Sequence, residues 1–152
     1  MTRRQTTPEQ WLIANDRIEA AQWQVLRKLP RGSGVLLLQR PDPEQGRRLR
    51  HLARRRGLMM LVESPRRASR AHNSRELRNA LLRRSPLIFL SPMWPTHSHP
   101  DWSPLPRMRA AALARLAGRR AFALGGMNAK RYAKIARLGF IGWAGISAWS
   151  GT

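Results

Sequence analysis

The sequence predicts an α/β fold built on a parallel sheet, arranged either as an open doubly wound sheet or as a (β/α) barrel. Short apolar runs alternate with amphipathic segments along the chain, a rhythm that produces parallel strands joined by right-handed helical crossovers. The chain has 152 residues, whereas a complete eightfold barrel usually takes roughly 200 residues or more. A barrel made from this chain would therefore be shortened.

Short apolar runs are the predicted strands. Because they are continuous and flanked by Gly, Pro or polar residues, they are typical of strands buried on both faces of a parallel sheet. The six runs are Trp11–Ala14, Val35–Leu38, Leu58–Val62, Leu87–Leu90, Ala121–Leu124 and Phe140–Ile146.

Amphipathic segments between these runs are the predicted helices. Ser74 and Asn128 carry the short polar side chains that cap helix N-termini. Gly57, Gly118 and Gly139 stand where helices should end. The five segments are Glu19–Leu29, Pro43–Arg56, Ser74–Arg84, Arg107–Ala117 and Asn128–Leu138.

The alternation is interrupted after the third run. The segment 63–70 leads from Val62 towards the next helix with no room for a helical crossover, so two units of the repeat are compressed into one. The length of 152 residues and the 42% hydrophobic content fit one globular domain. We expect a single domain over 1–152 with a deletion near 63–70.

The charge is strongly positive, because 29 Lys and Arg against 8 Asp and Glu give a net charge of +21. Such a surface attracts polyanions at low salt. However, the arginines are spread over the polar faces of predicted helices, and few aromatic residues are present to stack on bases. We expect nucleic acid to bind only non-specifically.

The chain contains no cysteine, which excludes disulfides, thiolate nucleophiles and Cys-based metal sites. No uncharged apolar run approaches the ~18–20 residues of a membrane-spanning helix. The polar stretch 1–10 also lacks the apolar core of a signal peptide. These features predict no membrane association and a cytoplasmic location.

Gly125 and Gly126 follow an apolar run and precede a predicted helix that begins near Asn128. Such a turn presents backbone N–H groups beside a helix N-terminus, where a phosphate is held well. A glycine pair is also an ordinary way to turn the chain. The turn therefore predicts a phosphate site, with a plain connection as the alternative.

Four motifs occur in order along the second half of the chain: Ala71–Leu77, Leu90–Pro100, Ala123–Asn128 and Gly145–Trp149. In order and spacing they resemble the C-terminal half of the thiamine-phosphate synthases, which share their barrel with the thiazole tautomerases. The resemblance implies a shortened or incomplete TIM (β/α) barrel. It also implies a reaction that joins a pyrimidine pyrophosphate to a thiazole phosphate with Mg²⁺, giving thiamine phosphate and pyrophosphate.

The resemblance assigns the thiazole-phosphate end of the site to two loops. The backbone amides of Gly125 and Gly126, with those around Ser147 and Ala148, would bind the phosphate. This is the usual phosphate position after the last two strands of such barrels.

Further ligand contacts follow from the other motifs. Thr96 and Ser98 match hydroxyl positions of a ligand-contacting loop, and Asn73 is a further substrate-binding candidate. His99 stands where the family commonly has a lysine for pyrophosphate, so it is a candidate catalytic residue.

The pyrophosphate end departs from the family pattern. Arg40 is the one cation retained after the second predicted strand, and it is a candidate catalytic residue. Mg²⁺ needs hard oxygen ligands, usually carboxylates. Only Glu63 stands at the end of the third strand, and the segment that should carry a second acid falls in the deletion. We therefore expect at most a weak Mg²⁺ site at Glu63, and activity that is low or absent.

His72 matches the histidine that thiazole tautomerases use for proton transfer without a metal, chemistry that suits an imidazole with a pKa of roughly 6.5. Three functions stay open. The first is transfer of the aminomethylpyrimidine group to thiazole phosphate. The second is either binding of a phosphorylated ligand without transfer or tautomerase chemistry at His72, and the third is basic nucleic-acid binding. Small phosphorylated thiazole and pyrimidine ligands are the expected partners, and a homo-oligomer stays open.

Overall fold

The computed structural model describes residues 6–15 and 17–149. Strands and helices alternate within them except at one place, where two strands follow each other directly. The strands are β1 (Gln10–Ala14), β2 (Gly34–Leu37), β3 (Met59–Val62), β4 (Ala68–Ala71), β5 (Leu87–Leu90), β6 (Ala121–Leu124) and β7 (Gly142–Gly145). The helices are α1 (Ala20–Lys28), α2 (Pro43–Arg56), α3 (Ser74–Leu82), α4 (Arg107–Ala117), α5 (Ala129–Ile135) and a short 3-10 helix, Ala136–Leu138.

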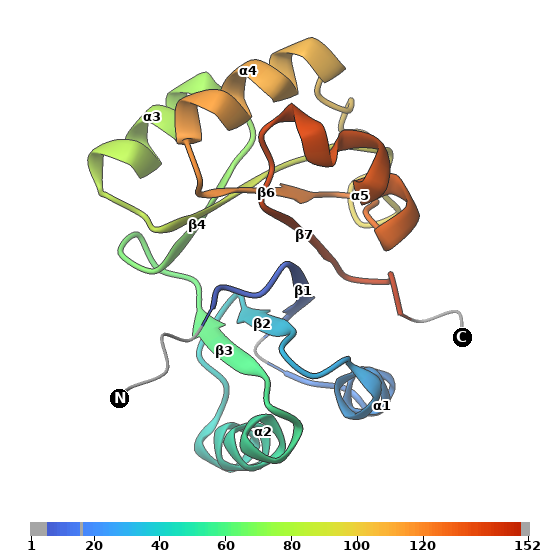
Figure 1. The fold of residues 1–152 in the computed structure, drawn as a ribbon. Helices are drawn as coiled ribbons and strands as arrows, with labels where there is room; N and C mark the ends of the chain where they lie inside the picture. Colours follow the sequence, from blue (N-terminus) through green and yellow to red (C-terminus); the bar gives the residue numbers. More distant parts are fainter. Residues whose placement is uncertain (1–5, 16, 150–152) are drawn as a thin grey trace.

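All strand pairings within the sheet are parallel, in the order β3-β2-β1-β7-β6-β5-β4. The sheet curls into a half-barrel that carries its helices on the outside (Figure 1). β3 and β4 are its two edges, so the barrel does not close through a strand pair between them. The expectation of an α/β fold with a shortened (β/α) barrel is confirmed.

Apolar side chains fill both faces of the sheet. On the concave face, Trp11 packs edge-on against Phe89 and Phe122, with ring centroids 6.0 and 6.1 Å apart. On the convex face, α1 and α2 cover one part of the sheet and α3, α4 and α5 cover the other. Burial on both faces explains why most strands are readable as continuous apolar runs.

One strand, β4, was not predicted from the sequence. β4 reads Ala-Ser-Arg-Ala and lies at a sheet edge, where Ser69 and Arg70 are only half-buried. The Oγ atoms of Ser69 and Ser85 are 2.5 Å apart. Because its middle residues satisfy polar partners instead of filling a core, β4 has no apolar run, and the segment 63–70 is a turn plus a strand.

The turn between β3 and β4 replaces a helical crossover. Ser64 and Ala68 form an isolated antiparallel bridge, and Ser64 N donates to the Ala68 carbonyl oxygen at 3.1 Å. The Ser85 hydroxyl donates to the Pro65 carbonyl oxygen, which ties the turn to the end of α3. A short turn thus connects β3 directly to β4 within the segment 63–70.

Two of the predicted caps differ in outcome. Asn128 caps α5, because its Oδ1 accepts from the backbone N–H of Arg131 at 2.9 Å. Ser74 was the wrong choice for α3, whose cap is Asn73, with Oδ1 accepting from the N–H of Glu76 at 2.9 Å. Among the described residues, no helix is long and apolar enough to cross a membrane.

Candidate functional site

The loops that follow β5, β6 and β7 enclose a pocket of about 450 Å³, which we call the glycine pocket. These strands are neighbours in the sheet, so their carboxyl ends meet at one edge and bring distant segments together. The pocket is lined by Pro95, Thr96, His97, Ser98, Leu124, Gly125, Gly126, Met127, Asn128, Arg131, Gly145, Ile146, Ser147 and Ala148. Six residues assigned to the ligand from separate motifs therefore line one cavity.

The two glycines are required by local geometry. Gly125 and Gly126 have φ values of +95° and +59°, which L side chains rarely adopt. A Cβ atom on Gly125 would lie 2.8 Å from Pro92 Cα, and one on Gly126 would lie 2.6 Å from the Pro95 carbonyl oxygen. The glycine pair thus lets the loops after β5 and β6 pack backbone to backbone, whether or not a ligand binds.

The polar groups of the glycine pocket are only partly used by the protein. Within the described part of the chain, the backbone N–H groups of Gly126, Ser147 and Ala148 donate no hydrogen bond. The Thr96 hydroxyl accepts from the N–H of Ser98 at 3.2 Å, which fixes the loop. Unpaired amide donors beside a cavity are the groups that hold phosphate oxygens.

Arg131 supplies the positive charge of this pocket and was missed in the sequence. Its Nη1 donates to the Gly126 carbonyl oxygen, and its guanidinium lies 5.7 Å from the Trp94 ring centroid. One feature of the sequence could have indicated this role. A cation in the first turn of a helix interacts unfavourably with the helix dipole, so its presence there needs another explanation. Asn128 already accepts a hydrogen bond from the first turn of α5, so Arg131 and the loop amides are the groups that remain available to an anion.

A second cluster surrounds His72, which directly follows β4. The His72 Nδ1 and Glu76 Oε2 atoms are 2.8 Å apart, and the backbone N–H of His72 donates to the same oxygen at 2.7 Å. Trp102 meets the His72 ring edge-on at 4.7 Å and stacks on His99 at 4.1 Å. A cavity of about 310 Å³, which we call the His72 cavity, is lined by His72, Glu76, Pro92, Trp102 and Ser103.

His72 stabilises the ionised form of the Glu76 carboxyl group. Partial burial by itself raises the pKa of Glu76, but hydrogen bonds from the His72 backbone and ring, the charge of His72 and a hydrogen bond from Asn73 together outweigh it. The pKa of Glu76 is therefore lower than its ordinary value. An ionised Glu76 fixes the orientation of the imidazole, as a carboxylate does in a general-base pair.

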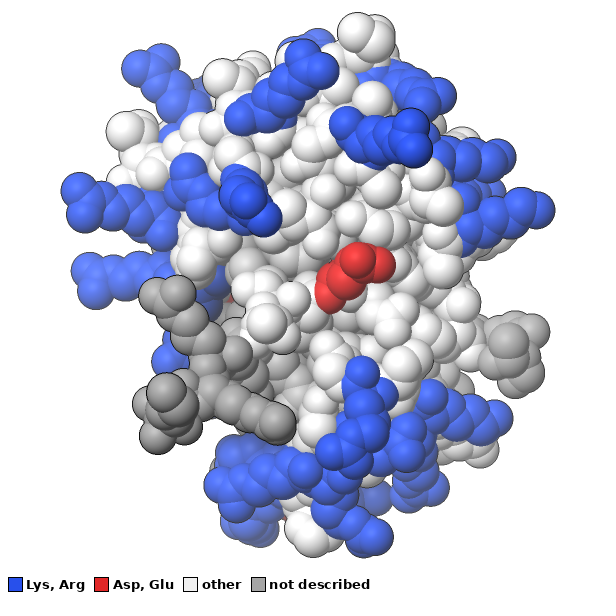
Figure 2. Space-filling view, viewed as in Figure 1, with Lys and Arg blue, Asp and Glu red and all other residues white. Residues whose placement is uncertain are grey.

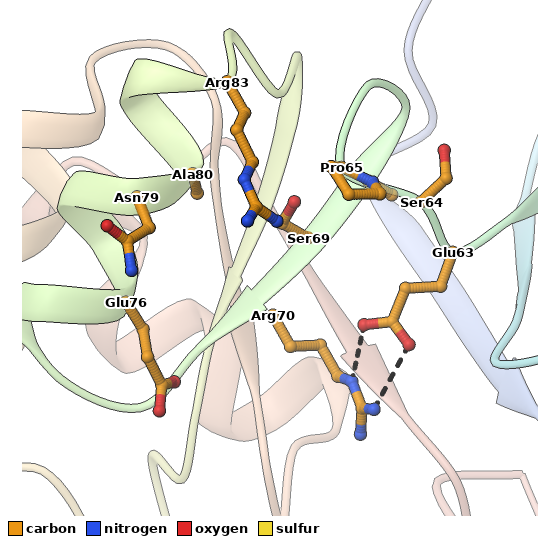
Figure 3. Close-up of a pocket in the computed structure, with 10 residues that line it drawn as sticks. Glu63, Ser64, Pro65, Ser69, Arg70, Glu76, Asn79, Ala80 and Arg83 are labelled. Carbon is orange, nitrogen blue, oxygen red and sulfur yellow. Dashed lines mark hydrogen bonds and ion pairs between the residues drawn. The ribbon is translucent and has the colours of Figure 1, made fainter.

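Glu63 was the expected Mg²⁺ ligand, and both of its carboxylate oxygens face Arg70. Arg70 Nε donates to Glu63 Oε1 at 2.8 Å and Nη2 donates to Oε2 at 3.2 Å. Figure 3 shows this pair beside a cavity of about 370 Å³ between α3 and the turn. In the described residues, no group of three or more His, Cys, Asp or Glu side chains could hold a metal. Both oxygens of Glu63 are thus engaged by Arg70, and the described residues do not offer a three-ligand Mg²⁺ site.

Two other predicted site residues, Asn73 and Arg40, line neither the glycine pocket nor the His72 cavity. The side chain of Asn73 caps α3 and also donates a 3.3 Å hydrogen bond to Glu76 Oε1. Arg40 is exposed after β2.

The loop after β5 borders both cavities: Pro95–Ser98 line the glycine pocket, and Pro92, Trp102 and Ser103 line the His72 cavity. His99, predicted as a catalytic residue, lines neither cavity and stacks on Trp102.

Comparison with known proteins identifies the fold. No protein-family model matches the chain, and no curated protein matches it by sequence. A thiamine phosphate pyrophosphorylase structure from Pyrococcus furiosus superposes with a TM-score of 0.74 and 15% identity, covering 97% of this chain and 90% of that one. The chain thus shares the (β/α)-barrel fold of that structure, in a shortened form.

Two other solved structures share the fold more distantly. One is described as native KDPGal, with a TM-score of 0.59, 12% identity, and coverage of 93% of this chain and 83% of that chain. The other is a designed cube-shaped protein cage, with a TM-score of 0.61, 13% identity and coverage of 97% and 67%. At these identities the likeness concerns the fold, and the reaction has to be argued from the site.

Proposed function

We propose that the chain binds a small phosphate monoester of the thiazole phosphate class in the glycine pocket. The observation that carries the proposal is the convergence of Thr96, Ser98, Gly125–Gly126 and Ser147–Ala148 on one cavity of about 450 Å³. These residues come from three different motifs of the same family resemblance. A pocket of this volume accommodates a ligand of one ring and one phosphate.

The phosphate would be held by two kinds of donor. The unpaired amide N–H groups of the loops after β6 and β7 supply neutral hydrogen bonds, and Arg131 supplies a charge-assisted one. The guanidinium is already oriented by Gly126 and Trp94, so little side-chain entropy would be lost on binding.

Transfer of the aminomethylpyrimidine group is the wider reaction implied by the resemblance. Glu63 is engaged by Arg70, Arg40 is exposed, and the described carboxylates form no metal-binding group. The geometry therefore supports ligand binding more strongly than transfer. The Pyrococcus furiosus structure, named for thiamine phosphate chemistry, supports testing both.

Calorimetry with thiazole phosphate and with the corresponding thiazole alcohol tests the binding proposal. We expect binding of the phosphate, and affinity at least tenfold lower for the alcohol. Arg131→Gln should weaken phosphate binding about tenfold, since a charge-assisted hydrogen bond is worth roughly 1.5–3 kcal/mol. Arg137→Gln, at an exposed arginine of the neighbouring 3-10 helix, is the matched control and should bind normally.

Equal affinity for phosphate and alcohol, or no heat with either, would contradict the binding proposal. Thiamine phosphate formation from both substrates is followed in parallel with and without Mg²⁺. Product formation that requires Mg²⁺ and is lost in Glu63→Gln would instead establish the transferase.

Proton transfer by His72 is a second candidate, favoured by the 2.8 Å contact between its Nδ1 and Glu76. With Nδ1 oriented by the carboxylate, Nε2 is the nitrogen left to exchange a proton with a ligand. Incorporation of solvent deuterium into a thiazole phosphate tautomer would report this activity. We expect it to be lost in His72→Asn and reduced in Glu76→Gln, and unchanged exchange in His72→Asn would exclude this role.

A further inference from the structure

A groove between α1 and α2 outside the candidate site is lined by four arginines. We call it the basic groove. Its volume is about 420 Å³, and it is lined by Trp23 and Arg27 from α1 and by Arg48, His51, Arg55 and Arg56 from α2. In Figure 1 these two helices lie below the sheet, on the opposite side of the molecule from α3 and α4.

The positive charge of the basic groove is not neutralised by described carboxylates. The ion pairs between described residues are Glu63–Arg70 and His72–Glu76, neither of which involves the groove. Figure 2 shows Lys and Arg side chains crowded at the bottom of the molecule, where Figure 1 places α2. An anion entering the groove would therefore not compete with acidic side chains of the described chain.

Helix electrostatics explain only part of this arrangement. Arg54, Arg55 and Arg56 lie in the last turn of α2, where cations complement the helix dipole, and Arg27 does the same in α1. Arg48 lies in the first half of α2, where the dipole gives no such benefit. It shares a helix face with Arg55, seven residues and about 10 Å further along the axis.

Aromatic and hydrogen-bond contacts preorganise the groove. The Arg48 guanidinium lies 4.6 Å from the Trp23 ring centroid and covers an indole that is 9% exposed. At the inner end, Arg56 Nη2 donates to the Leu29 carbonyl oxygen at 2.9 Å, while its buried Nε has no partner within the described structure. The contacts thus hold two guanidinium groups of the groove, those of Arg48 and Arg56, in position.

We propose that the basic groove binds single-stranded nucleic acid. Arg27, Arg48 and Arg55 would contact successive phosphates, because guanidinium donors match phosphate oxygens in a bidentate fork. The face of the Arg48 guanidinium opposite Trp23 would stack on a base, a contact that unpaired bases offer and duplexes do not. An acidic polypeptide would gain the charge interaction but not the stacking.

The test is fluorescence anisotropy with a labelled 20-nucleotide single-stranded RNA over a series of salt concentrations. The groove variant carries Arg27→Gln, Arg48→Gln and Arg55→Gln. The control carries Arg78→Gln, Arg109→Gln and Arg119→Gln, which are exposed arginines of the other half of the molecule. Both variants lose the same net charge, and thermal melts followed by circular dichroism confirm that each remains folded.

We expect the groove variant to bind RNA at least tenfold more weakly than the control at low salt. Its salt slope should also fall by about 2, given roughly 0.7 per phosphate contact on a single strand. Arg48→Lys, which keeps the charge but loses the plane, should give an intermediate affinity.

Three results would overturn the proposal. Equal weakening in both triple variants would show that net charge alone attracts RNA. Displacement of RNA by polyglutamate of equal charge at equal concentration would show a general polyanion surface. Equally tight binding of duplex DNA would remove the base-stacking contact.

Discussion

The glycine pocket and the turn between β3 and β4 lie on one sheet but use their polar groups in different ways. At the turn, Glu63 pairs with Arg70, and Ser85 bonds to both Ser69 and Pro65. In the glycine pocket, described amide donors stay without partners beside a cavity. Polar groups that satisfy one another stabilise a fold, whereas polar groups left open beside a cavity are available to a ligand.

The difference follows from where the barrel is shortened. Between β3 and β4 the chain has two sheet edges to connect and places an ion pair there. Where β5, β6 and β7 are neighbours in the sheet, the loops that follow them meet around one cavity. The comparison predicts that substitutions at the turn act on stability and that substitutions in the pocket act on ligand binding as well.

The largest expected effect is that of Gly125→Ala. The φ of +95° and the 2.8 Å approach to Pro92 should together lower the free energy of unfolding by about 3 kcal/mol. Urea unfolding measures it. Gly32→Ala is the control, since Gly32 has a φ of +80° with nothing within 4 Å of a Cβ atom; it should cost about 1 kcal/mol. Equal costs would show that the two loops are not in tight contact.

Next in size is the ion pair at the turn. Glu63→Gln and Arg70→Gln, with the double variant, should give a coupling energy of about 1 kcal/mol, because both side chains are partly exposed. Thermal melts should be unchanged by millimolar Mg²⁺. Stabilisation by Mg²⁺ that disappears in Glu63→Gln would instead make Glu63 a metal ligand and break the contrast between the two regions.

The helix caps offer a matched pair, one at the start of α3 and one beside the glycine pocket. Asn73→Ala and Asn128→Ala should each lower stability by about 1 kcal/mol, since each side chain accepts one backbone N–H at 2.9 Å. Asn128 also lines the glycine pocket. Only Asn128→Ala should therefore weaken thiazole phosphate binding, as measured by calorimetry. Weaker binding in Asn73→Ala would restore Asn73 as a substrate-binding residue.

The smallest effect concerns pH. Because the pKa of Glu76 is lower in the folded chain than its ordinary value of 4.5, the unfolded chain takes up a proton first as the pH falls. The stabilisation is complete above the ordinary value and is lost as the pH drops through the folded value. Glu76→Gln should show a smaller loss of stability than the wild type between pH 5 and 3. Parallel pH profiles would mean that Glu76 is not adapted to His72.

Strand and helix positions were largely readable because each element repeats one physical rule. Runs such as Leu87–Leu90 and Ala121–Leu124 are buried on both faces and coincide with β5 and β6. Helices α2 and α4 begin and end at the predicted residues. β4 was not readable, because an edge strand paired by serines and an ion pair carries no apolar run.

The site was readable only in part. Loops after neighbouring parallel strands must meet, so Gly125–Gly126 and Ser147–Ala148 could be placed together from the order of the strands. The partners of charged side chains could not be placed in this way. Glu63 pairs with Arg70 on the next strand, and Arg131 meets Gly126 and Trp94 of two other loops, so neither pairing leaves a local pattern. The Asn73 cap is different, because Asn73 and Glu76 are three residues apart and that spacing is readable in a sequence.

By itself, the sequence determined most of the alternation of strands and helices, its interruption near 63–70 and the glycine turn, because hydrophobic periodicity and backbone freedom are local properties. Only the tertiary structure decided that the barrel stays open between β3 and β4, that Glu63 belongs to Arg70, and that Arg131 supplies the charge of the glycine pocket. Which ionic groups meet depends on the curvature of the sheet and the packing of its loops.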